Sequence, residues 1–303
     1  MNNMQNDRQD KFILSPILNI LQDTVNACAG ISKGIEAQSL AEYVLQTTFL
    51  KMTGASEQKL KCICWEMATN DFGYRYQYLK KNYGECSSYA DKSSIYKDLV
   101  NAITGLDSQF TVDFLFGDVD ISPKVEDLIN QKILRTQKAQ EAKKKKAMAE
   151  ADLEKMRNGM KAYYARNGLC DKERFQFSRV VLFESIQDTL DAIVKNSLLA
   201  QWEQHNYLNF KNGWKKLSDW SFAEGDTLLC KELQDFYTSF VYNHRNRCAH
   251  NLKSFQNNLP TLKTLTSEGF VYENYFYRFS ILLLLDEIFV RLYKRYVELV
   301  GIV

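Results

Sequence analysis

The chain has 303 residues, of which 45% are hydrophobic and 25% are charged. These shares are close to those of ordinary globular domains, so they exclude wholesale disorder and a fibrous repeat. The formal net charge of +2 does not by itself indicate a nucleic-acid-binding protein, because an electrostatic footprint depends on how charges cluster. Only three prolines occur, which favours long uninterrupted helices and an all-α fold.

The cysteines and the apolar segments favour a cytoplasmic protein. The seven cysteines are odd in number and scattered, and most stand among apolar residues at helical spacing, as small buried thiols do. The opening sequence MNNMQNDRQDK lacks the layout of a secretory signal. The most apolar stretch, Phe279 to Leu285, is followed at once by Asp286 and Glu287 and is too short to span a bilayer. We therefore expect no membrane contact.

Residues 1–122 are predicted to form an N-terminal helical domain of unknown role. Apolar residues recur at helical intervals from Ile13 to about Thr104, and Leu60, Ile63 and Cys64 are an example. A long basic helix or linker over residues 123–168 should follow, because serine before proline, at the end of the first domain, is a typical helix start.

The long basic helix carries the strongest charge cluster of the chain. Residues 131–167 contain eleven Lys or Arg against four Asp or Glu. The simplest interpretation is a solvated helical spacer, since charge runs are usually solvated faces. A second interpretation, compatible with the first, is that four consecutive lysines also attract RNA phosphates. These residues are Lys143, Lys144, Lys145 and Lys146.

Residues 169–303 are predicted to form a second helical domain, a bundle. Helical periodicity is strong in three segments, Phe175–Gln204, Thr227–His250 and Tyr272–Leu299. The predicted fold class is therefore all-α, with two helical domains joined by a long charged helix.

Acid–base chemistry near neutral pH has few candidates, because histidine occurs only at His205, His244 and His250. Two of the three lie in the heptapeptide HRNRCAH, which closes the second helical segment of the bundle. In this heptapeptide Arg245 is followed by Asn246 and, five positions after the arginine, by His250. The pattern resembles the motif of the HEPN superfamily, in which arginine is followed by four to six residues and then histidine. The resemblance covers about residues 170–303.

The resemblance implies a metal-independent endoribonuclease with no cofactor, of the kind that acts as a toxin or antiviral-defence effector. In such enzymes the 2′-hydroxyl attacks the adjacent phosphate of RNA and leaves a 2′,3′-cyclic end. His250 would act as general base or acid, and Arg245 would balance charge on the transition state by a bidentate contact. Asn246 would position His250 or a phosphate oxygen. An antitoxin or a trigger partner is also expected.

Helical geometry predicts that the site needs two copies of the chain. Asn246 and His250 are four residues apart and share a face of an ideal helix, whereas Arg245 and His250 fall near opposite edges of the apolar stripe. A homodimer would supply both groups across a two-fold axis, as the HEPN resemblance also implies. Two alternatives stay open: a non-catalytic HEPN-like adaptor for RNA binding or dimerisation, and a nucleotide-binding sensor.

Three residues close to the motif have their own interpretations. His244 lies on the apolar stripe with Cys248, so it is expected to be a core or interface histidine. Arg247 either contacts RNA or places a favourable cation at the helix C-terminus. A zinc site built from His244, Cys248 and His250 is not predicted, because no paired ligand set completes it.

Overall fold

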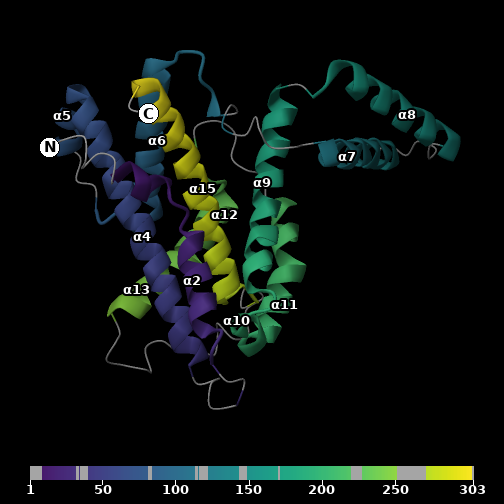
Figure 1. Cartoon of the computed structure of the whole chain (residues 1–303). Coiled ribbons are helices and arrows are strands. Elements are labelled where there is room, and N and C mark those ends of the chain that lie inside the picture. Colours follow the sequence, from purple (N-terminus) through teal and green to yellow (C-terminus); the bar gives the residue numbers. More distant parts are fainter. Residues whose placement is uncertain are drawn as a thin grey trace. The chain divides into compact units, whose positions relative to one another are not determined.

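The computed structural model describes residues 9–31, 34, 40–80, 84–112, 115, 122–142, 149–169, 171–219, 227–250 and 271–301. The regular structure in these ranges is helical and includes no strand, which confirms the all-α class (Figure 1). The elements are α2 (Leu18–Cys28), α4 (Ala41–Asn70), α5 (Phe72–Lys80), α6 (Tyr89–Leu106), α7 (Ser122–Ala142), α8 (Glu150–Asn167), α9 (Asp171–Val194), α10 (Leu198–Trp202), α11 (Gln204–Gly213), the 3₁₀ helix η2 (Trp214–Asp219), α12 (Lys231–Phe236), the π-helix η3 (Tyr237–Tyr242), α13 (Asn243–His250) and α15 (Tyr275–Val300). Among the described helices, none combines the length and the apolar character needed to cross a bilayer.

The chain divides into two compact units whose bounds differ from the predicted domains. One unit combines Met1–Thr111 with Phe183–Val303, and the other is Val112–Leu182. The two ends of the sequence therefore share one core, where the sequence predicted separate domains over 1–122 and 169–303. The reason is that α15, from the C-terminal part, packs mainly against α4 and α6, from the N-terminal part.

Helix α15 is the centre of the larger unit. It begins at the N-cap Asn274, whose side chain accepts hydrogen bonds from the backbone N–H groups of Phe276 and Tyr277. It ends at Gly301, which has a φ of +73° and forms a left-handed C-cap. Residues are buried on all sides of the helix over most of its length, as expected for a helix surrounded by others.

A buried ion pair joins α4 to α15. The Lys59 ammonium lies 2.6 Å from a carboxylate oxygen of Asp286, and the two side chains are only 5% and 7% exposed. The other carboxylate oxygen accepts a hydrogen bond of 2.9 Å from the backbone N–H of Ile17, and Lys59 also donates to the carbonyl of Ser15. These contacts fix the segment before α2 to both long helices.

The smaller unit contains two packed helices where the sequence predicted one long helix over 123–168. Helix α7 begins at Ser122, as expected, but ends at Ala142, and α8 packs against it. Their shared core exists because both helices carry apolar stripes that need a partner. The buried core residues are Leu128, Ile129, Ile133, Tyr164 and Leu169. Lys143, Lys144, Lys145 and Lys146 lie outside the described residues.

Candidate active site

The motif lies at the end of a helical run formed by α12, η3 and α13. The predicted apolar stripe is present in this run, since Leu233, Tyr237, Val241 and Cys248 are all buried. Its middle is a six-residue π-helix, a wider form that breaks the regular α-helical hydrogen-bond ladder and is frequent at functional sites. The guanidinium of Arg278 donates a 2.8 Å hydrogen bond to the carbonyl of Phe240 within this stretch. The π-helix is thus fixed to α15 just before the motif begins.

Arg245 joins the motif helix to α4. Its guanidinium lies 3.0 Å from a carboxylate oxygen of Glu57 and also donates, at 3.3 Å, to the side-chain oxygen of its neighbour Asn246. The side chains of Arg245 and Glu57 are 22% and 13% exposed, so the pair lies at the edge of the core. This position leaves the guanidinium accessible from one side.

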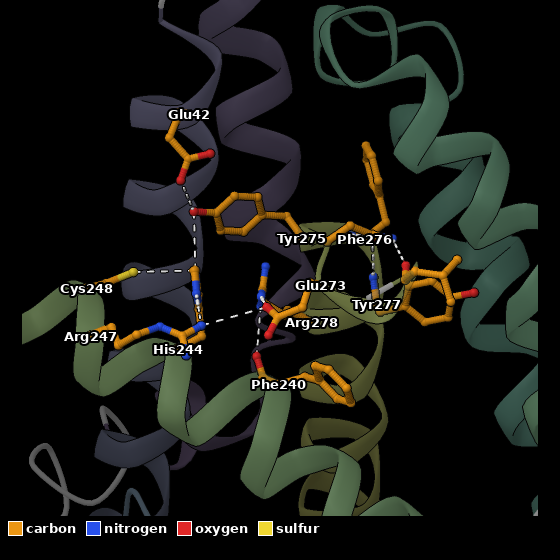
Figure 2. A network of polar contacts seen from close by, with 12 residues as sticks. Glu42, Phe240, His244, Arg247, Cys248, Glu273, Tyr275, Phe276, Tyr277 and Arg278 are labelled. Carbon is orange, nitrogen blue, oxygen red and sulfur yellow. Dashed lines mark hydrogen bonds and ion pairs between the residues drawn. The ribbon is translucent and has the colours of Figure 1, made fainter. Parts of the chain in front are cut away.

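His244 lies in a hydrogen-bond chain that crosses three helices (Figure 2). Arg247 contacts Nδ1 of His244 at 3.3 Å and can only donate, so Nδ1 is the acceptor and the ring proton is on Nε2. Nε2 lies 3.3 Å from the Tyr275 hydroxyl, which in turn donates to Glu42 at 2.6 Å. Cys248 is also within 3.4 Å of Nε2.

The environment of His244 keeps its imidazole neutral. Burial, together with the positive charges of Arg278 and Arg247, lowers the pKa of His244 to about 2 from its usual 6.5. A histidine with this pKa cannot take up a proton near neutral pH. The expectation that His244 is a core residue is therefore supported by its contacts and by its charge state.

Arg247 points toward α15. Its guanidinium is 3.7 Å from Glu273, which also pairs with the buried Arg278. The side chain of Arg247, which is predicted to contact RNA, is 37% exposed and also pairs with Glu273 within the protein. His250 is the last residue of α13, and its side chain lies outside the described part of the structure.

Lys92 adds a cation to the Arg245 site, and it is not among the residues predicted from the sequence. The side chain is buried, and its ammonium donates a 2.6 Å hydrogen bond to the carbonyl of Cys86. Burial lowers the pKa of Lys92 to about 8, the negative charge of Glu57 opposes this shift, and the positive charge of Arg245 adds to it. Lys92 therefore lies close enough to both Glu57 and Arg245 for their charges to act on it.

The loop before α6 holds this lysine contact in place. Cys86 has a φ of +59°, a left-handed conformation that costs a non-glycine residue about 1–2 kcal/mol. In the same loop Glu85 pairs with Lys61 of α4, and its pKa is lowered by that lysine and, more weakly, by Arg245. Charged groups of both signs therefore surround the motif arginine.

A sequence signal for Lys92 existed, but none identified Glu57 as the partner of Arg245. Lys92 occupies a position in the apolar stripe of α6, in register with Ile95, Tyr96 and Leu99, and a lysine in such a stripe predicts a buried charge with a partner. Glu57 is 188 positions from Arg245, and no local pattern connects them.

Comparisons of the chain with family models, with curated proteins and with solved structures find no match.

Proposed function

We propose that the protein is a metal-independent endoribonuclease of the HEPN type that acts as a toxin or phage-defence effector. The observation that carries the proposal is the setting of the motif. Arg245 stands on a helix that directly follows a π-helix, and it lies among Glu57, Lys92 and Lys61. Burial lowers the pKa of Lys92, and the contact with Glu85 raises the pKa of Lys61. Such shifts within a cluster of ionisable groups are typical of functional sites.

The state of His244 leaves His250 as the motif histidine that we propose for proton transfer. Because His244 stays neutral and is fixed by Tyr275 and Arg247, it does not exchange a proton with substrate near neutral pH. The ordinary pKa of a histidine, about 6.5, suits a general base or acid. In this proposal His250 has that role.

The proposed reaction is an internal transesterification of RNA. One His250 takes the proton of the 2′-hydroxyl as its oxygen forms a bond to the adjacent phosphorus. The bond from phosphorus to the 5′-oxygen breaks, and a second imidazole, in its protonated form, gives the leaving oxygen a proton. Arg245 contacts the phosphate oxygens through two N–H groups, which requires the phosphate to replace the carboxylate of Glu57.

Two copies of the chain are part of the proposal. His250 is five positions after Arg245, which corresponds to a rotation of about 140° on an ideal helix. An ideal helix therefore presents these two positions in different directions, and in the proposal a second copy, related by a two-fold axis, supplies the group that the first cannot.

The test is RNA cleavage by the purified protein in excess EDTA. We expect the wild type to cut single-stranded RNA to products with 2′,3′-cyclic ends, and His250→Ala to lose at least a hundredfold in rate. His205→Ala is the matched control and should cleave normally, because His205 is outside the motif. Equal rates for the wild type and His250→Ala would contradict the proposal.

A second candidate function is a non-catalytic helical adaptor, and it is favoured by the internal ion pairs of the motif arginines. Arg245 is paired with Glu57 and Arg247 with Glu273, as expected if both arginines serve mainly to hold the helices together. Glu57→Gln separates the two candidates. It releases Arg245 for phosphate and should raise RNA affinity in a nuclease, whereas an adaptor of this kind would lose stability without any gain in RNA binding or cleavage.

A further inference from the structure

A pocket of about 670 Å³ lies at one end of the larger unit, apart from the motif helix. It forms where three long helices finish, since Asn70 ends α4, Leu106 ends α6 and Val300 ends α15, and all three residues line it. The end of a helix carries carbonyl groups without helical partners and a partial negative charge. Three such ends at one pocket therefore create a region of negative potential.

Carboxylates strengthen this negative potential. Asp71 and Asp98 both line the pocket, and the described lining residues include no Lys, Arg or His. The first turn of α5 also reaches the pocket, but Asp71 already accepts hydrogen bonds from its Gly73 and Tyr74 N–H groups, at 2.7 and 3.1 Å. Asp71 and the positive end of α5 thus offset each other in part, and Asp98 and the three helix ends supply the rest of the negative potential.

Tyr296, which lines the pocket, lies close to negative charges. Burial raises the pKa of its hydroxyl, a hydrogen bond with Asn70 opposes the shift, and the negative charges of Asp71 and Glu66 raise it further. Glu66 is itself buried on α4 and lies close enough to act on Tyr296. A positive charge in the pocket would meet the carboxylates of Asp71 and Asp98.

Aromatic side chains supply the apolar part of the wall. Tyr74 and Tyr296 are buried in the wall, and Phe72 is 82% exposed at its edge. The face of an aromatic ring attracts an organic cation, and the ring body packs against an apolar stem. On the α6 side Ala102 and Gly105 are small and leave room for a ligand.

We propose that this pocket binds a small organic cation, with an ammonium or guanidinium group on an apolar stem, as in the alkyl polyamines. The cation lies between the Asp71 and Asp98 carboxylates, facing the ends of the three helices, and its stem lies against Tyr74 and Tyr296. The site is independent of the ribonuclease proposal, because it shares no residue with α13.

The test is calorimetric titration of the full chain with agmatine, with 1,4-butanediol as the neutral comparison. We expect agmatine to bind with a dissociation constant in the millimolar range or below, to weaken as salt rises, and the diol not to bind. Asp98→Asn should weaken agmatine binding on the order of tenfold, since it removes one of two nearby charges. Asp23→Asn, an exposed carboxylate on α2, is the matched control.

A second variant blocks the pocket without changing its charge. A Cβ at Gly105 meets no atom within 4 Å, so Gly105→Leu should fold and fill the space, and agmatine binding should be lost. Gly159→Leu, at a similarly open position in α8, should bind agmatine as the wild type does. N-acetylarginine methylamide represents an arginine side chain within a peptide. If agmatine binds more tightly than this compound, the site is specific for a small free amine, as proposed; if it binds more weakly, the site recognises a peptide side chain and the proposal is wrong. Absent binding, or equal binding by Asp98→Asn and the wild type, overturns the proposal.

Discussion

Two residues of α4 that are two positions apart, Glu57 and Lys59, form ion pairs in different environments. Lys59 meets Asp286 at 2.6 Å with both side chains less than a tenth exposed, whereas Glu57 meets Arg245 at 3.0 Å with 13% and 22% exposure. A fully buried pair holds its partners permanently, because separating them leaves a charge in a medium of low dielectric. A pair at the edge of the core can exchange one partner for an incoming anion. One face of α4 thus stabilises the core, and another holds the motif arginine.

The largest expected effect comes from breaking the buried pair. Asp286→Ala leaves the Lys59 ammonium buried without its carboxylate, and we expect a loss of about 3–5 kcal/mol in the free energy of unfolding. Urea unfolding followed by circular dichroism measures the loss. The double variant Lys59→Met with Asp286→Leu should restore most of the lost free energy of unfolding. If Asp286→Ala were as stable as the wild type, the buried pair would not stabilise the protein more than the Glu57–Arg245 pair.

The next effect concerns acid stability on the motif side. The folded pKa of His244 is about 2 and its usual value is 6.5, so below pH 6.5 the unfolded chain binds a proton that the folded chain does not. The contribution of His244 to stability is therefore complete above pH 6.5 and is lost as pH falls, by up to about 1.4 kcal/mol per pH unit. When the free energy of unfolding is measured between pH 7 and pH 4, it should depend less on pH in His244→Gln than in the wild type. If this free energy changed equally with pH in both proteins, the His244 imidazole would take up a proton in the folded protein as it does in the unfolded chain.

Breaking the edge pair should cost less than breaking the buried one. Glu57→Gln keeps the shape and removes the charge, and we expect a loss of about 1 kcal/mol, because water reaches Arg245. Chemical unfolding at low and high salt checks this, since the difference from wild type should shrink at high salt. A loss as large as that of Asp286→Ala would remove the distinction between the two pairs.

The smallest effect is a gain that leaves both pairs unchanged. Gly54 lies inside α4, and a Cβ there meets no atom within 4 Å, so Gly54→Ala should stabilise the protein by about 0.4–1 kcal/mol. The matched contrast is Gly213→Ala, where the added Cβ would lie 2.0 Å from the Tyr277 hydroxyl and should destabilise. A higher melting temperature for Gly213→Ala than for Gly54→Ala would contradict this.

Local patterns in the sequence predicted the bounds of some helices well. Pro123 in the first turn placed the start of α7 correctly, and apolar periodicity placed the last helix within about three residues of its observed bounds. The stripe through Val241 and Cys248 correctly identified the inward face of the motif helix. These features depend on residues within a few turns of one another, so the sequence alone specifies them.

The tertiary structure decided which helices share a core and which groups surround the motif. The pairing of α15 with α4 and α6, which merges the two ends of the chain, depends on how distant surfaces fit. The same holds for Glu57 beside Arg245 and for the neutral state of His244, because a pKa follows from burial and from charges that folding brings near. A helical period repeats every few residues, so it cannot indicate that Arg245 contacts Glu57, which is 188 positions away.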